Sequence, residues 1–162
     1  MFCQCNIIAI LIIMMKRLKL VLGLAFSVLI VVSACKPKKK PLSERIAKAW
    51  VAQTVKHDNT LVYEKGGSGG SAPGYSGYQL VLGTDNTATL TDLDGTTFTG
   101  TWELQGETRL ILKNLGPEQP TGSGGKLEFT IKSIEDNKLV LLSVSPSIKT
   151  GNTVNEYSLT VR

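Results

Sequence analysis

Cysteine and histidine are scarce in this 162-residue chain, which contains three cysteines and a single histidine, His57. A zinc site needs several such ligands at close spacing, so we expect no metal. The glycine-rich stretch 66–74 does not end in Gly-Lys-Ser/Thr, so it is not a phosphate-binding loop. A Ser-His-Asp catalytic triad could be assembled from the residues present, but the sequence has no nucleophile-elbow motif to support one. We therefore expect neither an enzyme nor a cofactor, and we interpret His57 as a surface residue.

Charged residues are also few, at 19% of the chain, and they are unevenly placed. Seven of the 18 basic residues lie in residues 1–40, which contain no acidic residue, so residues 41–162 carry 11 basic and 13 acidic residues and a net charge of −2. A nucleic-acid-binding domain keeps a basic face in its folded part, so we expect no nucleic-acid partner. The hydrophobic fraction of 42% is too high for a disordered chain, and the length suits one domain plus a tail.

The N-terminal part of the chain has the organisation of a targeting segment. An uncharged apolar run of 15 residues, 20–34, follows a short basic segment, 16–19. A helix of that length spans about 22 Å, which is short of the roughly 30 Å hydrocarbon core of a bilayer. The pattern predicts a secretory signal peptide over 1–34, with translation starting at Met14 or Met15. One long uncleaved anchor is the alternative, and it would place the basic residues inside the membrane.

The apolar run ends in Val32-Ser33-Ala34-Cys35, which resembles the bacterial lipobox. The resemblance implies that Cys35 receives a diacylglycerol, that the chain is cut before it, and that the new amino terminus is acylated. Two or more acyl chains anchor a protein stably to a bilayer. An ordinary signal peptide with an incidental cysteine is the alternative. Removal of 1–34 leaves Cys35 as the only cysteine, so the mature domain can have no internal disulfide.

Residues 35–41 form a lysine- and proline-rich tether after the leader. Its four lysines either bind anionic headgroups, at roughly 1 kcal/mol each, or serve as a solvated spacer. In lipoproteins of Gram-negative bacteria, residues just after the cysteine guide sorting, and an Asp or an acidic cluster there redirects the protein. The tether has neither, so the resemblance implies an outer-membrane lipoprotein that faces the periplasm.

The body of the chain alternates apolar and polar residues with a period of two from Trp50 onward, which is typical of β-strands. The gaps are short and turn-rich, so neighbouring strands are antiparallel. Asp94-Gly95 predicts a two-residue type I′ hairpin, and residues 42–49 predict a short helix with Ser43 as its N-cap. The predicted strands cover 50–57, 60–65, 76–82, 87–92, 97–105, 108–114, 126–134, 138–144 and 155–162.

Alternation also sorts the strand faces: in 97–105, Phe98 and Trp102 point one way and the threonines the other. Strand 138–144 is apolar on both faces, so we expect the 42–49 helix to cover its outer face. Eight or nine strands must remove their free edges, and closure into an antiparallel up-and-down β-barrel does so by pairing the last strand with the first. A two-layer sandwich is the alternative.

A family resemblance rests on the helix, the Trp50 that opens the first strand, Asp94-Gly95-Thr96, Gly100-Thr101-Trp102 and Leu110-Ile111-Leu112. These motifs resemble the small lipocalin-like domains of bacterial lipoproteins. The resemblance covers residues 42–162 and implies a calycin-type barrel, related to lipocalins and fatty-acid-binding proteins.

Two classes of function follow. The first is a binding module that holds a small apolar ligand inside the barrel, and the second is a structural or interaction lipoprotein of the envelope with a filled core, whose protein partners are unknown. Small eight-stranded barrels accommodate either. The connections 66–74, 115–125 and 145–154 are interpreted as solvated. The residues that either line the ligand or fill the core are Trp50, Tyr78, Phe98, Trp102, Phe129 and Tyr157.

Overall fold

The computed structural model describes residues 39–67 and 70–162. The predicted signal peptide, Cys35 and the start of the tether lie outside these residues. Within the described part of the chain, no helix is both long enough and apolar enough to cross a bilayer. Residues 40–162 form a unit with its own hydrophobic core, so this part of the chain can fold by itself.

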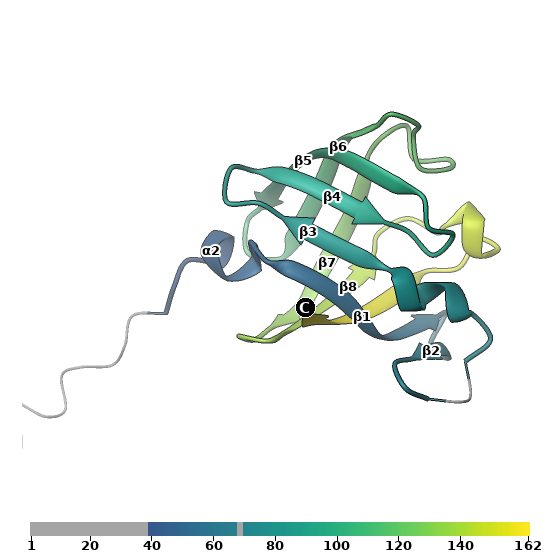
Figure 1. The fold of residues 1–162 in the computed structure, drawn as a ribbon. Helices are drawn as coiled ribbons and strands as arrows, with labels where there is room; N and C mark the ends of the chain where they lie inside the picture. Colours follow the sequence, from purple (N-terminus) through teal and green to yellow (C-terminus); the bar gives the residue numbers. More distant parts are fainter. Residues whose placement is uncertain (1–38, 68–69) are drawn as a thin grey trace, which may run out of the picture. The chain divides into compact units, whose positions relative to one another are not determined.

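The strands of this unit are antiparallel and match the predicted ones to within three residues at each end (Figure 1). The largest difference is at the third strand, because the 3-10 helix η1 (Pro73–Gly77) takes up residues assigned to its start. The strands are β1 (Ala49–His57), β2 (Thr60–Glu64), β3 (Gln79–Leu82), β4 (Thr87–Thr91), β5 (Thr97–Gln105), β6 (Arg109–Gly116), β7 (Leu127–Ile134), β8 (Lys138–Ser143) and β9 (Asn155–Val161).

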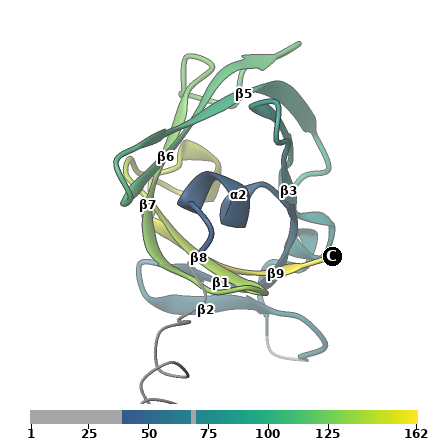
Figure 2. The ribbon, with the colours of Figure 1, turned by 90° about the vertical axis from the view of Figure 1, so that its left-hand side faces the viewer.

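Eight of the strands, β1 and β3 to β9, close into a barrel, and the predicted sandwich alternative is excluded (Figure 2). The closing pair is the predicted one: β9 runs antiparallel to β1, from Trp50 opposite Val161 to His57 opposite Asn155. This pairing satisfies the backbone of the last strand along almost its whole length, so the ring has no free edge there.

Strand β2 is an extra strand outside this ring. A two-residue turn joins it to β1, and both turn residues, Asp58 and Asn59, have positive φ, which is the type I′ geometry. β2 pairs with the C-terminal half of β1, whereas β3 pairs with β1 over Ala49–Val51 on the N-terminal half. One edge of β1 therefore serves two partners, and the ring passes from β1 directly to β3.

The inner face of the barrel carries the predicted apolar residues. In β5, Phe98 and Trp102 are buried while Thr97, Thr99 and the other alternate residues are exposed. The same alternation buries Leu139 and Leu141 in β8 and leaves the outward-facing Val140 and Leu142 half-buried. The period-two pattern therefore predicted which side chains face the interior.

The helix α2 (Leu42–Ile46) lies across one end of the barrel, as Figure 2 shows, rather than over the outer face of β8 as predicted. Its fully buried Ile46 joins the core, and the Trp50 Nε1–H donates a hydrogen bond of 2.8 Å to the Ile46 carbonyl. The Arg45 guanidinium donates to the Ile134 carbonyl at 2.6 Å. The residue before the helix is Pro41 and no side chain caps it, so the prediction of Ser43 as N-cap was wrong.

The turn between β4 and β5 is a hairpin, but not of the predicted type. Its Gly95 has φ +83°, whereas Asp94 lies outside the positive-φ region. The Gly95 N–H donates to the Asp92 carbonyl and the Asp92 N–H to the Thr96 carbonyl, both at 2.9 Å. These bonds describe a three-residue loop with glycine in the left-handed region, which is the second common way to join two antiparallel strands.

Candidate ligand-binding site

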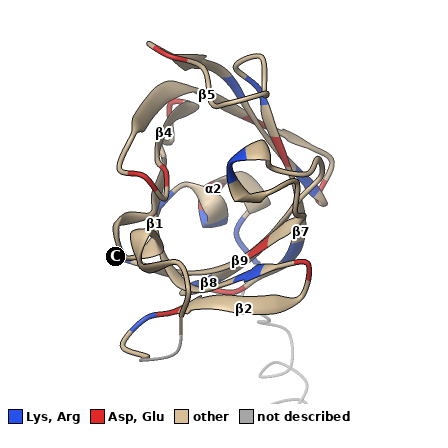
Figure 3. Cartoon of the chain, turned by 90° about the vertical axis from the view of Figure 1, so that its right-hand side faces the viewer, with Lys and Arg blue, Asp and Glu red and all other residues tan. Residues whose placement is uncertain are grey.

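A cavity of about 310 Å³ opens at the end of the barrel opposite α2. Figure 3 looks into the barrel from this end and shows that residues of both charges occur in the chain around the opening. The walls come from strands β4, β7, β8 and β9, from the residue before β3, from the hairpin after β4, and from the 117–126 and 144–154 loops. Both loops were interpreted as solvated connectors, and that prediction was wrong for the parts that line the cavity, which include the buried Pro120.

Aromatic rings form the inner wall. The Tyr78 and Tyr157 rings are stacked, with centroids 4.9 Å apart and an angle of 14° between their planes. The Phe129 ring meets Tyr157 edge-on at 6.0 Å. All three side chains are less than 10% exposed, so they present a rigid apolar surface to the cavity.

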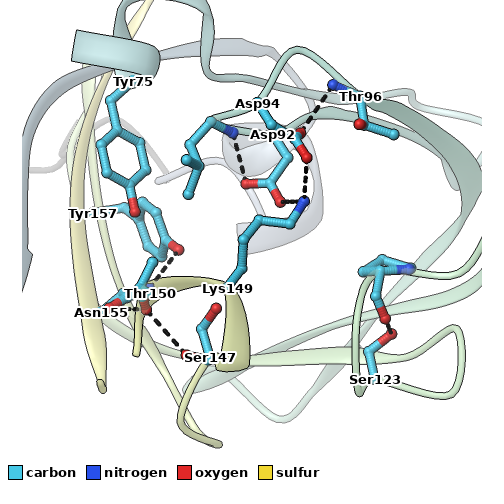
Figure 4. A network of polar contacts seen from close by, with 12 residues as sticks. Tyr75, Asp92, Asp94, Thr96, Ser123, Ser147, Lys149, Thr150, Asn155 and Tyr157 are labelled. Atoms are coloured by element: carbon cyan, nitrogen blue, oxygen red, sulfur yellow. Dashed lines mark hydrogen bonds and ion pairs between the residues drawn. The ribbon is translucent and has the colours of Figure 1, made fainter. Parts of the chain in front are cut away.

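A polar network fixes the Tyr157 hydroxyl (Figure 4). Asn155 is fully buried, and its Nδ2 donates to Tyr157 Oη at 3.2 Å and to Thr150 Oγ1 at 3.1 Å. Its Oδ1 accepts from Thr153 Oγ1 at 2.8 Å, and its backbone N–H donates to Ser143 Oγ at 2.8 Å. Burial raises the pKa of Tyr157 to about 12, against the opposite effect of the Asn155 bond, so the hydroxyl stays protonated.

An ion-pair cluster crosses the rim of the cavity, as Figure 4 shows. Lys149, on the short 3-10 helix η2 (Ile148–Thr150), reaches the hairpin between β4 and β5, where its Nζ lies 2.8 Å from Asp92 Oδ2 and 2.9 Å from Asp94 Oδ2. The Lys149 bond holds the pKa of Asp94 down at about 2. Burial lowers the pKa of Lys149, but the bonds to both aspartates outweigh it and raise the pKa. The cluster thus ties together two loops that are 55 residues or more apart in the sequence.

The six aromatic residues selected from the sequence separate into two groups. Tyr78, Phe129 and Tyr157 line the cavity. Trp50 and Trp102 are buried near the α2 end, where Trp102 Nε1–H donates to the Gly83 carbonyl at 2.9 Å. Phe98 is buried behind the rim, with the Lys149 ammonium 5.7 Å from its ring centroid. The barrel is therefore filled at one end and hollow at the other.

His57 does not lie free on the surface as expected. It is half-buried at the end of β1, and its Nε2 lies 2.8 Å from the hydroxyl of Tyr75, a fully buried residue of η1. Burial lowers the pKa of His57, and the nearby Asp58 carboxylate partly opposes the shift. Burial also raises the pKa of Tyr75 above its ordinary range. The pair anchors η1 to the barrel beside the cavity wall.

Sequence reasoning missed Lys149, Asn155 and the pairing role of Asp92. The sequence predicted a hairpin turn at Asp94-Gly95 and placed Asp92 at the end of a strand, and Lys149 lies in a loop without a motif. Within the residues that the structure describes, no group of three or more histidine, cysteine or acidic side chains is placed to hold a metal ion.

No protein-family model matches the chain, and no curated protein is similar to it. Two solved structures are similar. One is a lipocalin-like protein from Bacteroides uniformis, with 14% identity and a TM-score of 0.48 over 73% of this chain and 99% of that one. The other is an uncharacterized protein from Bacteroides eggerthii, with 12% identity and a TM-score of 0.44 over 72% and 98%. The assignment of an eight-stranded barrel rests on the strand pairings described above.

Proposed function

We propose that the protein is a non-catalytic binding protein that holds a small, largely apolar ligand in the cavity opposite α2. The observation that supports this most directly is the cavity itself: about 310 Å³, with the Tyr78, Phe129 and Tyr157 rings on its wall and a ring of polar groups at its rim. Ligand sites are typically clefts of about 300–1,000 Å³ with apolar walls and a few placed polar groups. The volume is at the lower end of that range, which favours a ligand of one or two rings.

Filling the cavity tests this role. Leu127→Trp places a large side chain on the cavity wall, whereas Leu104→Trp makes the same change at a half-buried inward position of β5 that does not line the cavity. We expect the domain spanning 36–162 to bind the small fluorescent probe 1-aminonaphthalene saturably and one-to-one. Leu127→Trp should abolish binding and Leu104→Trp should retain it. If no probe binds, a structural role in the envelope with no ligand becomes the better account.

The proposal includes a lipid anchor on the periplasmic face of the outer membrane. It is supported by the basic segment, the apolar run and Val32-Ser33-Ala34-Cys35 in the sequence. The mature chain then begins at a lipidated Cys35, and its four tether lysines lie beside the headgroups. Mass spectrometry of the membrane-extracted protein should show an acylated Cys35 at the amino terminus, and Cys35→Ser should leave an uncut precursor. A wild-type chain that retains residues 1–34 would contradict the proposal.

A further inference from the structure

We propose that the cavity selects uncharged ligands and rejects carboxylates, because the charges at its rim are already paired within the protein and the most buried group of them is net negative. This inference rests on the proposed binding function and specifies the chemical class of the ligand. It predicts that, of two ligands with the same apolar body, the one with a neutral polar group binds more tightly than the one with a carboxylate.

Four charged side chains line the cavity, and each is paired. Lys149 lies 2.8 Å from Asp92, and Lys126 lies 2.5 Å from Glu128. Each pair has a further partner close by: Asp94 at 2.9 Å from Lys149, and Arg109 at 3.0 Å from Glu128. Neither lysine is therefore a free cation for a ligand carboxylate, and an incoming anion would have to compete with a carboxylate already in place.

The group of Lys149, Asp92 and Asp94 is more buried than the group of Lys126, Glu128 and Arg109. The more buried group therefore governs which ligands the cavity accepts. The Lys149 and Asp92 side chains are only 20% and 17% exposed, and with Asp94 they carry a net charge of −1. The Lys126 and Arg109 side chains are 49% and 40% exposed, so water and salt screen their net positive group. Interactions between charges strengthen as burial increases. A carboxylate in the cavity is therefore repelled by the Asp92 group more than the Lys126 group attracts it.

The remaining polar lining suits a neutral group. The hydroxyl-bearing residues Ser143, Ser145 and Ser147 line the cavity together with Tyr78 and Tyr157. A hydroxyl can both donate and accept a hydrogen bond, so it satisfies an alcohol or amide without a charge. A buried carboxylate that lacks a cationic partner keeps an uncompensated desolvation cost. The lining thus provides partners for an uncharged polar group and none of the compensation that an anion needs.

Three probes with the same apolar body test this selection: 3-phenylpropan-1-ol, 3-phenylpropanoate and 3-phenylpropylamine. Each is titrated at pH 7 into the 36–162 domain, and NMR follows the Tyr78 and Tyr157 ring signals, with the distant Trp102 indole N–H as the reference. We expect saturable shifts at both tyrosines and at least tenfold tighter binding of the alcohol than of the carboxylate. The amine should bind more tightly than the carboxylate as well.

Replacing Asp92 and Asp94 by asparagine tests whether the negative charge of this group causes the selection. In Asp92→Asn/Asp94→Asn the amide oxygens can still accept the Leu93 and Thr96 N–H bonds, but Lys149 loses both counter-charges. The carboxylate should then gain at least tenfold relative to the alcohol. Asp94→Asn alone, at a more exposed position, is the milder variant and should give a smaller gain in the same direction. Asp85→Asn/Glu107→Gln removes two negative charges from turns outside the cavity lining and should leave the ratio unchanged.

The outcomes separate this inference from the function on which it rests. If none of the three probes shifts the tyrosine signals, the binding function fails and the inference fails with it. If the carboxylate binds as tightly as the alcohol or more tightly, the selection is wrong while the binding function stands. If the alcohol is preferred but the Asp92/Asp94 variants leave the ratio unchanged, the buried charge group is not its cause and the inference is overturned.

Discussion

Truncation of Trp102 should show which end of the barrel is a packed core. The side chain is 5% exposed, its Nε1–H donates to the Gly83 carbonyl at 2.9 Å, and it does not line the cavity. Trp102→Ala therefore removes a large ring and an internal hydrogen bond from a filled region. Substitutions of this kind cost about 3–5 kcal/mol, which is a large part of the roughly 5–15 kcal/mol that stabilises a domain.

The matched substitution at the other end is Phe129→Ala. Phe129 is 4% exposed, nearly the same as Trp102, but its ring faces an open cavity. Truncation there enlarges an existing space instead of creating a void, so fewer packing contacts are lost. We expect its cost to be lower than that of Trp102→Ala by about 1 kcal/mol or more, because the cost of truncation follows the new cavity it creates.

Urea unfolding of the 36–162 domain, followed by circular dichroism, measures both changes. With a denaturant slope of about 2 kcal/mol per molar, Trp102→Ala should lower the unfolding midpoint by about 2 M. The slope itself should stay close to that of the wild type. A loss of stability below about 1 kcal/mol for Trp102→Ala, or a larger loss for Phe129→Ala, would refute the division into a filled end and a hollow end.

Three further predictions concern single contacts. Gly95→Val forces a β-branched residue to φ +83° and should cost about 1–3 kcal/mol; an unchanged urea midpoint would contradict the hairpin geometry. Trp50→Phe removes the bond to the Ile46 carbonyl and should cost about 1 kcal/mol, with faster amide exchange in 42–47 than in the wild type; unchanged exchange would mean that α2 is held by other contacts. Because the folded pKa of Asp94 is depressed to about 2, its pairing with Lys149 stabilises the fold above the ordinary carboxyl pKa near 3.8 and is lost as the pH falls through 2. The pairing contributes less than about 1 kcal/mol to the free energy of unfolding, because the Asp94 side chain is 44% exposed. An NMR titration of Asp94 checks the pairing. A pKa near 4, or a pKa that Lys149→Met leaves unchanged, would contradict it.

The inward side chains could be predicted because alternation is a local property. Successive residues of a strand point to opposite faces, so Phe98 and Trp102 on one side and Thr97 and Thr99 on the other could be assigned from the sequence. Closure by β9 against β1 also followed, since a meander of this many strands must remove its edges. Turn positions were predictable for the same local reason.

Turn types were not predictable to the same degree. Asp94-Gly95 carries the stronger two-residue signal, yet Asp58-Asn59 has the type I′ geometry. An Asp-Gly pair is compatible with either loop length, because glycine supplies the positive φ in both. The choice depends on the register of the flanking strands, which is fixed by side chains distant in the sequence.

The cavity was decided by the tertiary structure alone. The alternation of strand residues placed Trp102 and Phe129 on the inner face of the barrel. It did not show how far along the barrel axis each residue lies, because that position depends on the relative offset of all the strands. That offset places Trp102 at the filled end and Phe129 at the open one. Lys149 and Asp92 are 57 positions apart in the sequence, so only the fold brings them together. Periodicity depends on neighbours along the chain, whereas the cavity and its charges depend on long-range register.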